Sequence, residues 1–409
     1  MPSLTDRLKS LGVQVGAESL KPPRETRDRS VRMHLGGEIV ATVRGDAFVV
    51  ERRYPVEGSS YPAPLWGTGS LEMLGTWARE PGVAGLERDS FAFLDTETTG
   101  LSGGAGTFAF MVGIGKFEGD EFRLAQFFLR EPGEEPAQLA AIEQFLAGTT
   151  ALVSFNGKSF DAPVVNTRYA MYQQPSPLDG MAHLDLLHLA RRLWKLRLPS
   201  RRLGDLETDV LAIARGAEDI PGFLVPQMYI DYLRTGDAEP LKGVFYHNEW
   251  DVLTMAALMT HIVDLLSNPV EATRHDLDLL SIGVLHEDLG QVSEAQALYL
   301  ECLGRPLEEG AWLEAARRLS FVYKRTEDWD NAVKLWQTAA GKGELYAHAE
   351  LAKYHEHRTR DLEAALEWTR GALEKIEAQG FPILQRYQWQ SELEKRLKRL
   401  VGKIGRISE

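Results

Sequence analysis

Three short runs of apolar, strand-forming residues lie close together in the middle of the chain, at residues 91–97, 107–117 and 121–129. A glycine-rich stretch separates the first two runs, and the tripeptide 118–120 separates the last two. Runs of this length with short turns between them predict the neighbouring strands of a meander. Residues 135–148 then place apolar side chains three and four positions apart, which predicts an amphipathic helix.

Helices and a further strand follow in the next part of the chain. Residues 150–161 predict a strand, a turn and the start of a helix, and residues 184–196 and 248–267 predict two further helices. Consecutive strands followed by alternating helices and strands are typical of a mixed sheet flanked by helices. We therefore expect an α/β domain at residues 89–268, with a mixed sheet flanked by helices.

The part of the chain ahead of this domain has a different pattern. Residues 1–35 are polar and of mixed charge, without apolar periodicity, which predicts a loosely attached lead-in. Short strand-like pieces follow at 38–43 and 47–55, and a turn-rich segment comes after them. We expect residues 1–88 to form an N-terminal extension that is partly flexible, with short strands and little helix.

From about residue 270 the pattern is helical and repetitive. Three stretches each predict a helix, a short polar turn and a second helix; they are residues 279–303, 316–340 and 347–373. A small residue recurs early in each second helix, at intervals of 37 and 33 residues, namely Ala295, Ala332 and Ala365. This interval is similar to that of tetratricopeptide repeats. We expect residues 269–409 to form an all-α tetratricopeptide-like stack of helical hairpins, capped by residues 391–404.

Composition narrows the class of protein. The 409 residues are 44% apolar and 26% charged, as in ordinary globular chains of more than one domain. A net charge of −13, from 46 basic and 59 acidic residues, excludes a protein that coats nucleic acid along its whole length. The single cysteine excludes an internal disulfide framework and fits a reducing compartment. Without an apolar run of membrane-spanning length or a secretory signal, we expect a cytoplasmic protein with no membrane segment.

The first motif that could carry chemistry is an acidic pair at the end of the first strand, Asp95 and Glu97. Residues two apart on a strand point to the same face, so both carboxylates meet at one edge of the sheet. Placing them after a buried run is costly unless a cation or hydrogen bonds compensate, and oxygen-rich sites of this kind suit Mg²⁺ or Mn²⁺. A strand that merely emerges into water, with Thr98 beginning a turn, would give the same pattern.

The second motif runs from Asn156 to Asp161, between a strand and a helix. Asp161 lies near the start of that helix, where a carboxylate is favoured even without a ligand. Asn156 is either a turn residue or a polar contact to substrate, and Lys158 faces either a phosphate or water.

The third motif is at the start of the helix predicted at 248–267. His247 and Asp251 are four residues apart and so share one helical face. A carboxylate beside a histidine can provide a metal ligand and a general base. The alternative is a capped helix start with a surface histidine.

Together these motifs resemble the DEDD superfamily of 3′-to-5′ exonucleases, which have a ribonuclease-H-like fold. The D-x-E motif corresponds to Asp95 and Glu97, the N-x3-F/Y-D motif to Asn156, Phe160 and Asp161, and the final acid to Asp251. Four longer stretches resemble the YprB-type ribonuclease-H-like family, in which tetratricopeptide-like helices can follow the nuclease-like domain; they are residues 95–110, 153–165, 183–194 and 219–237. The resemblance covers roughly residues 40–265, and the C-terminal helices more loosely.

The resemblance implies a mechanism with two Mg²⁺ or Mn²⁺ ions, about 4 Å apart, which activate water and stabilise the leaving 3′ oxygen. Asp95, Glu97 and Asp251 are then the inner ligands, and Asp161 binds through a water. Well-studied branches of the superfamily place a histidine five residues before the last acid or a tyrosine four before it. Here Tyr246 and His247 occupy these positions with their identities exchanged.

At the tyrosine spacing, His247 shares the helical face of Asp251. We therefore expect His247 to orient or deprotonate the water, with Tyr246 as the alternative. The exchange also leaves room for weak or lost activity.

Substrate contacts are expected at two places. The turn from Thr98 to Gly106 could shape a pocket for the 3′-terminal nucleotide, with Leu101 wedged against a base, or its glycines could only serve the turn. Residues 190–202 hold six basic residues and no acid, including Arg191, Arg192 and Lys195. Such a stretch could neutralise phosphates, or it could be a solvated helix face. His183 and Asp185 precede it, and we expect a core or helix-start role for them rather than an extra metal contact.

The leading hypothesis is a metal-dependent 3′-to-5′ exonuclease acting on DNA or RNA, whose helical repeats recruit a protein partner or cover the substrate. The alternatives are a catalytically weak or inactive module that binds nucleic acid or protein, a structure-selective endonuclease, and a scaffold centred on the repeats. The sequence contains no Walker-type phosphate loop and no G-x-S-x-G nucleophile motif.

Overall fold

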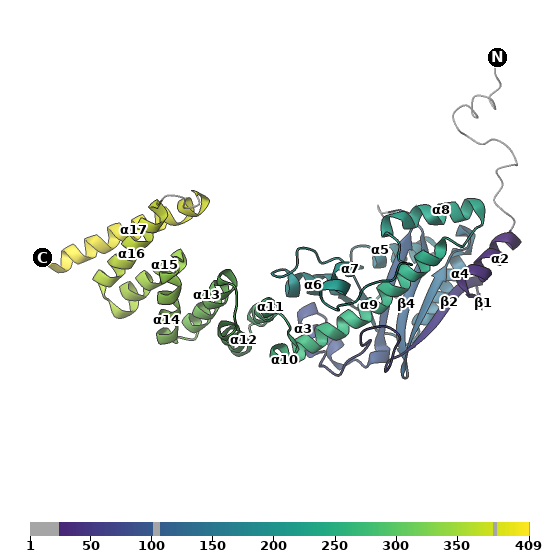
Figure 1. The fold of residues 1–409 in the computed structure, drawn as a ribbon, viewed down its shortest axis with the longest axis horizontal. Coiled ribbons are helices and arrows are strands. Elements are labelled where there is room, and N and C mark those ends of the chain that lie inside the picture. Colours follow the sequence, from purple (N-terminus) through teal and green to yellow (C-terminus); the bar gives the residue numbers. More distant parts are fainter. Residues whose placement is uncertain (1–23, 101–106, 379–382, 409) are drawn as a thin grey trace, which may run out of the picture. The chain divides into compact units, whose positions relative to one another are not determined.

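The computed structural model describes residues 24–100, 107–378 and 383–408. It divides into two compact units, residues 1–272 and 273–409. The first unit contains a sheet flanked by helices, and the second is a succession of helices (Figure 1). The two units are described separately below.

The sheet of the first unit has seven strands in the order β1-β2-β5-β4-β3-β6-β7. The strands are β1 (Glu38–Thr42), β2 (Gly45–Pro55), β3 (Phe91–Thr98), β4 (Ala109–Glu118), β5 (Glu121–Phe128), β6 (Ala151–Ser154) and β7 (Ala182–Asp185). Strands β3, β4 and β5 form the predicted meander, and β2 adds to it antiparallel through β5. On the other side of β3, β6 and β7 pair in parallel. The sheet is therefore mixed, which confirms the predicted fold class.

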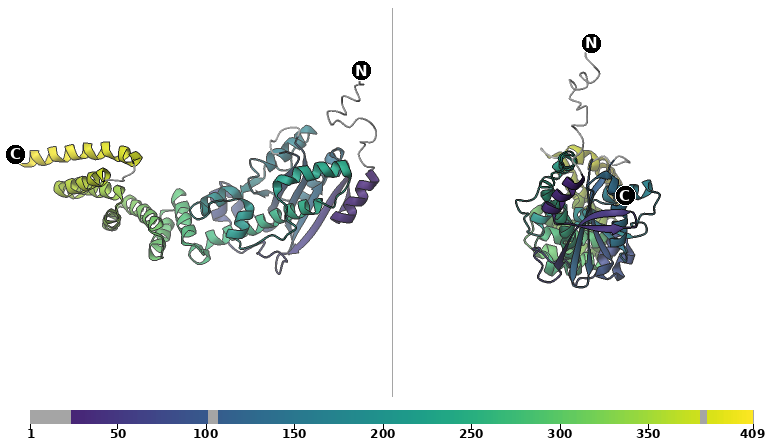
Figure 2. Two further views of the ribbon diagram at one scale, coloured as in Figure 1. Left: turned by 45° about the horizontal axis from the view of Figure 1, so that its top comes forward. Right: turned by 90° about the vertical axis from the view of Figure 1, so that its right-hand side faces the viewer.

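Helices cover both faces of this sheet (Figure 2). They are α2 (Arg24–Leu35), α3 (Glu72–Ala78), α4 (Glu135–Leu146), α5 (Asp161–Met171), α6 (Leu186–Trp194), α7 (Leu203–Asp209), α8 (Val225–Thr235), α9 (Leu241–Ser267) and α10 (Pro269–Ala272). The described part of this unit also contains the 3₁₀ turns η2 (Pro81–Gly85), η3 (Arg88–Ser90), η4 (Pro132–Glu134) and η5 (Gly222–Leu224).

Alternate residues of β2 belong to two separate cores, because successive side chains of a strand point to opposite faces. Ala47 and Val49 of β2 pack in one core with α4 and α5. Phe48 and Val50, one residue further along, pack in the other with α2, α8 and α9. This three-layer arrangement leaves the ends of the central strands as the place where polar residues from both layers can meet.

Helix α9 is the long central helix of the first unit. Its length and apolar composition would also suit a membrane span, but 72% of its most apolar window is buried inside the protein. A core helix meets the same length and composition criterion. Pro240 precedes its first residue, and proline is well tolerated at a helix start because it lacks a backbone N–H.

Three local features differ from the sequence prediction. Residues 24–35 form a helix within the lead-in that was predicted to be irregular, because Val31 and Leu35 are buried against the core. Strands β1 and β2 belong to the same sheet as the meander. Helix α9 begins at Leu241, so Tyr246 and His247 lie within the helix rather than at its start.

The second unit consists of consecutive antiparallel helices. They are α11 (Asp276–Asp288), α12 (Val292–Gly304), α13 (Glu309–Arg325), α14 (Trp329–Gly341), α15 (Leu345–Tyr354), the π-helical turn η6 (His355–Thr359), α16 (Leu362–Glu377) and α17 (Ile383–Ser408). Ala295, Ala332 and Ala365, the small residues of the repeat pattern, are all fully buried. The C-terminal region is therefore helical, as predicted. Leu393 and Leu400 of α17 are buried against the preceding helices.

Candidate active site

The two acids of the first motif lie on β3, the central strand. Asp95 is paired in register with Gly113 of β4, and Glu97 with Met111. Both acids are partly buried. No lysine or arginine of the described residues forms an ion pair with either carboxylate. The predicted convergence of two carboxylates at this edge of the sheet is thus present; within the described residues neither forms an ion pair, although the charge of Arg215 lowers the pKa of both.

Asn248 of α9 holds Asp95 in place. Its Nδ2 donates a hydrogen bond to Oδ2 of Asp95 at 2.8 Å, and its own Oδ1 accepts one from Nε2 of Gln126 at 3.0 Å. This approach depends on Gly113, since a Cβ there would lie 2.1 Å from Oδ1 of Asn248. Asn248 and Gln126 are fully buried, so the amide pair fixes the carboxylate from within the core.

Asp161, the first residue of α5, is turned toward β3. Its Oδ1 accepts hydrogen bonds from the backbone N–H of Thr96 at 3.1 Å and from the Thr96 hydroxyl at 2.5 Å. Phe160 is the N-cap of α5, and no side chain caps the helix there. Asp161 thus lies in the first turn of α5, where a carboxylate is favoured as expected, and its side chain also bonds to Thr96, between the two acids of β3.

Asp251 and His247 lie on one face of α9, with Nε2 of His247 3.6 Å from Oδ2 of Asp251. The other oxygen of Asp251 accepts a short hydrogen bond from the guanidinium of Arg215. Arg215 comes from the segment between α7 and α8. Nδ1 of His247 lies 2.8 Å from Oδ1 of Asp219, in the same segment. His247 and Asp251 were predicted as site residues from the sequence, whereas Arg215 and Asp219 were not.

The four acids repel one another. Burial raises the pKa of Asp95 well above its ordinary value, and the charges of Asp251 and Asp161 raise it further. The pKa of Glu97 is likewise raised by burial and then by the charge of Asp95. Burial also raises the pKa of Asp161, to about 6, against the opposing effect of its bonds to Thr96. A carboxylate cluster of this kind is stabilised by added positive charge.

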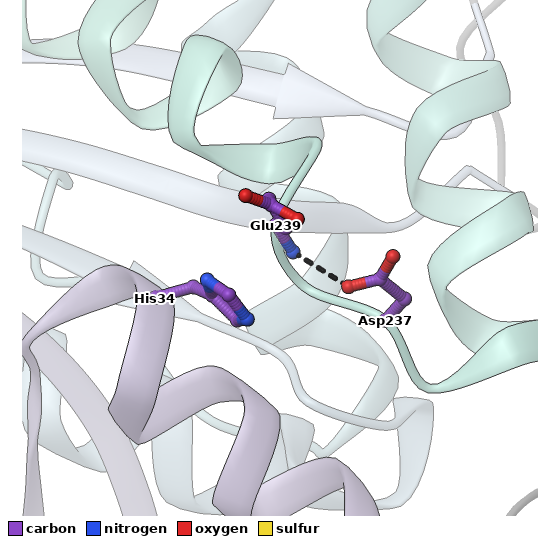
Figure 3. A group of neighbouring side chains, drawn as sticks. All are labelled: His34, Asp237 and Glu239. Carbon is purple, nitrogen blue, oxygen red and sulfur yellow. Dashed lines mark hydrogen bonds between the residues drawn. The ribbon is translucent and has the colours of Figure 1, made fainter.

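The chemistry of these donors fits a hard divalent cation, which prefers carboxylate oxygens. The four acids do not, however, form a tight preformed ligand set in the described residues. The three-residue group whose candidate ligand atoms all lie within 4.8 Å of one another consists of His34, Asp237 and Glu239 (Figure 3). In it, Oδ1 of Asp237 accepts the backbone N–H of Glu239 at 3.0 Å, and both acids are exposed. That group has the character of a surface turn rather than a buried centre.

Asp185 organises the turn of the second motif. Its Oδ1 accepts the backbone N–H of Asn156 at 2.8 Å, and its Oδ2 accepts that of Lys158 at 3.2 Å. It also caps α6 by accepting the backbone N–H of Leu187. The backbone of Asn156 has φ +67, a conformation that asparagine tolerates better than most residues. Asn156 is thus a turn residue here, and its side-chain contact with substrate stays a prediction.

The remaining predicted contacts are distributed around this turn and on α6. The ammonium of Lys158 lies 3.4 Å from Glu80, and the hydroxyl of Thr98 donates to the carbonyl of Gly100. Leu101 lies outside the described residues. Arg191, Arg192 and Lys195 are all exposed at the C-terminal end of α6 and just beyond it. Their role in binding phosphates stays a prediction.

His183 has a structural role. Its Nε2 lies 2.7 Å from the hydroxyl of Ser154 on the neighbouring strand. Burial lowers its pKa to about 4, helped by the charge of Lys158, which keeps the ring neutral near pH 7. With Asp185 as a helix cap, the expectation of core and helix-start roles for this pair is met by the geometry.

Comparisons with known proteins agree with the architecture. Residues 92–263 match the model of the RNase_H superfamily. The chain is also 32% identical, over 335 residues, to the protein named "Uncharacterized protein YprB" of Bacillus subtilis (strain 168); the match covers 78% of each chain. The matched superfamily region spans all four acids, His247 and the segment that carries Arg215 and Asp219.

Proposed function

The chain belongs to the YprB family and carries an RNase H superfamily domain, and on that premise we propose that it is a metal-dependent nuclease that removes nucleotides from the 3′ end of DNA or RNA. The observation that carries the proposal is the group of four acids on β3, α5 and α9. They gather at one place on a nuclease-like fold, and Asp95 and Glu97 have no cationic partner among the described residues.

The proposed cofactor is Mg²⁺ or Mn²⁺, with two ions as the expected number. Asp95, Glu97 and Asp251 would hold the metal directly, and Asp161 would do so through a water. Bound there, divalent ions supply the charge that lowers the pKa of water and stabilises a leaving oxygen. The bond from Asn248 to Asp95 and the bonds from Thr96 to Asp161 hold two of these carboxylates in fixed orientations.

The proposed general base is His247. Its Nε2 faces Asp251 across 3.6 Å, on the same side of α9 as the acidic cluster. The hydroxyl of Tyr246, the alternative base, accepts the backbone N–H of Gly216 at 2.9 Å. That contact gives Tyr246 a structural role, and it favours His247 as the residue that takes the proton from water.

One observation favours a second candidate function. Arg215 already neutralises Asp251, which leaves only one oxygen of that carboxylate for a metal. A chain with weakened metal binding could serve as a nucleic-acid-binding module on the same fold. The helical repeats, for which we propose a protein partner, and a cytoplasmic location would suit either function.

The test is a cleavage assay on 5′-labelled single-stranded and duplex DNA and RNA, with Mn²⁺ or Mg²⁺. The wild type is compared with Asp95→Asn and with the control Asp231→Asn, an exposed acid on α8. We expect a ladder that shortens from the 3′ end, is lost in Asp95→Asn and is kept in the control. Internal cuts would replace the exonuclease with an endonuclease. Absence of Asp95-dependent cleavage, together with retained nucleic-acid binding, would favour the binding module.

A further inference from the structure

The segment between α7 and α8, residues 210–224, makes three polar contacts with one short stretch of α9. Arg215 bonds to Asp251, Gly216 donates its backbone N–H to the hydroxyl of Tyr246, and Asp219 contacts His247. These are three separate bonds from one loop to residues 246–251 of the helix. The loop therefore fixes the face of α9 that carries the candidate base and the last acid.

Arg215 is bonded to Glu207 as well as to Asp251. Its Nε and Nη2 donate to the two oxygens of Glu207, at 2.6 and 2.5 Å. Glu207 is buried and also accepts the hydroxyl hydrogen bond of Thr254 at 2.5 Å. A bidentate arginine–carboxylate pair defines both position and orientation. Because Glu207 holds the guanidinium of Arg215 in place, its other N–H groups are directed toward Asp251 and Asp219.

The contact between Asp219 and His247 determines which ring nitrogen carries the proton. Nδ1 of His247 lies 2.8 Å from a carboxylate oxygen of Asp219 and 3.2 Å from Nη1 of Arg215. An unprotonated Nδ1 at 2.8 Å would set its lone pair against the oxygen lone pairs of Asp219. The contact with Asp219 is shorter than that with Arg215, so it favours Nδ1 as the nitrogen that carries the hydrogen and donates it to Asp219. In the neutral ring Nε2 is then left as the acceptor, on the side of Asp251.

We infer that Asp219 is a positioning residue of the active site, which holds His247 in the tautomer that a general base needs. This inference rests on the proposed function and adds to it the residue that orients the general base, His247. The arrangement follows the general logic in which a base is oriented by a third group bonded to its other nitrogen. Arg215 positions Asp251 in a similar way. It donates to Oδ1 and leaves Oδ2 on the side of His247.

The geometry also predicts what happens without Asp219. Its removal leaves Nδ1 with one near polar neighbour from this loop, Nη1 of Arg215, which can only donate. Nδ1 would then accept a hydrogen bond from Arg215, and the proton would move to Nε2. His247 would present a donor to the site in place of an acceptor.

The test reads the tautomer directly by two-bond ¹H–¹⁵N correlation spectra of the full chain, labelled at histidine, with EDTA and without nucleic acid. His247→Gln identifies the signal of His247 among the ten histidines. We expect Nδ1–H in the wild type and Nε2–H in Asp219→Ala. Glu218→Ala, which removes an exposed acid from the same loop, is the matched control and should resemble the wild type. An Nε2–H tautomer in the wild type, or an unchanged tautomer in Asp219→Ala, would overturn the inference.

Cleavage kinetics give a second readout on the same variants, after thermal unfolding has shown that each is folded. Loss of an orienting partner typically costs about 10–100-fold in activity, and we expect that loss in kcat for Asp219→Ala. KM and the affinity for Mn²⁺ should not change, and Asp219→Glu should recover part of kcat because it keeps a carboxylate. An equal loss in Glu218→Ala would contradict the assignment. A wild type that cleaves no substrate would refute the proposed function, while the spectra would still decide whether Asp219 orients His247.

Discussion

Buried acids are treated in opposite ways in the two units of the chain. In the helical unit, the side chain of Glu356 is fully buried, and it accepts hydrogen bonds from Arg396, Arg399 and Lys403 at 2.7–2.9 Å. Burial alone would raise the pKa of Glu356, but the bonds from Arg399 and Lys403 outweigh it and hold the pKa at about 2. In the described part of the sheet unit, no lysine or arginine forms an ion pair with Asp95 or Glu97, and the pKa values of both acids are raised.

Other buried acids of the sheet unit are satisfied by the protein, some by arginines and Asp185 by backbone N–H groups. Glu135 on α4 accepts two hydrogen bonds from the guanidinium of Arg168, and Glu134 accepts two from Arg130. The unpaired acids are therefore a local exception and not a property of that unit. The protein satisfies buried carboxylates elsewhere. The acids at the ends of β3 and α5 therefore need positive charge from a bound cation. This is the physical basis for placing a metal site there.

The largest effect on stability is expected from Glu356→Gln. The substitution leaves buried Arg396 with only its longer ion pair to Glu392, at 3.6 Å, and breaking a buried ion pair costs about 3–5 kcal/mol. The partial exposure of Arg399 and Lys403 places the expected loss at the lower end of that range. Chemical denaturation followed by circular dichroism measures it, with Glu367→Gln, an exposed acid on α16, as the control. An equal and small change in both variants would show that the ion pairs of Glu356 do not stabilise the helical unit.

The pH dependence of stability should differ between the two kinds of acid. Burial raises the pKa of Asp161 from 3.8 to about 6, so its stabilising contribution is full below about pH 4 and is lost as the pH rises through about 6. Glu356 behaves oppositely: with its pKa lowered from 4.5 to about 2, its contribution is present above pH 4.5 and is lost as the pH falls through about 2.

Thermal unfolding in EDTA between about pH 4 and pH 7 tests the contribution of Asp161, since that of Glu356 changes below pH 4.5. The wild type should lose stability across this range relative to Asp161→Asn, by on the order of 3 kcal/mol at most for the shift of Asp161. Asp179→Asn, an exposed acid shortly after α5, should follow the wild type. Parallel curves for the wild type and Asp161→Asn would show that Asp161 is not under electrostatic strain.

The smallest effect is expected from Glu97→Gln, and it should have the opposite sign to that of Glu356→Gln. Removing one of four repelling charges should raise the free energy of unfolding of the metal-free chain by about 1 kcal/mol, the scale of one pKa unit. The same denaturation measurement in EDTA checks this prediction. A destabilised Glu97→Gln would mean that the carboxylate is satisfied by the protein itself.

The sequence predicted the fold and the four acids because each depends on local pattern. The run at 91–97 contains both the apolar residues of a central strand and the two acids that end it, and apolar spacing defined α4. Helix α2 was missed because few of its residues are apolar, and only Val31 and Leu35 enter the core. Strand β7 was assigned to the start of a helix, because four residues at Ala182–Asp185 carry too little pattern.

The surroundings of the acids could not be predicted in the same way, because they are contacts between distant segments. Nothing near Asn248 indicates that it bonds to Asp95, since the contact requires the absence of a side chain at Gly113 on another strand. Arg215 and Glu207 belong to no recognised motif. Asp219 begins one of the stretches on which the family resemblance rests, and that was the available signal for its role.

The most direct test of the account is the binding of Mn²⁺ to the full chain without nucleic acid, measured by electron paramagnetic resonance or calorimetry. The wild type is compared with Asp95→Asn, with Glu97→Gln and with Asp231→Asn as the control. We expect binding to the wild type and the control, and loss of that binding in both β3 variants, because neither carboxylate forms an ion pair within the described residues. Equal Mn²⁺ binding in all four proteins, or none in the wild type, would contradict the assignment of these acids as a metal site.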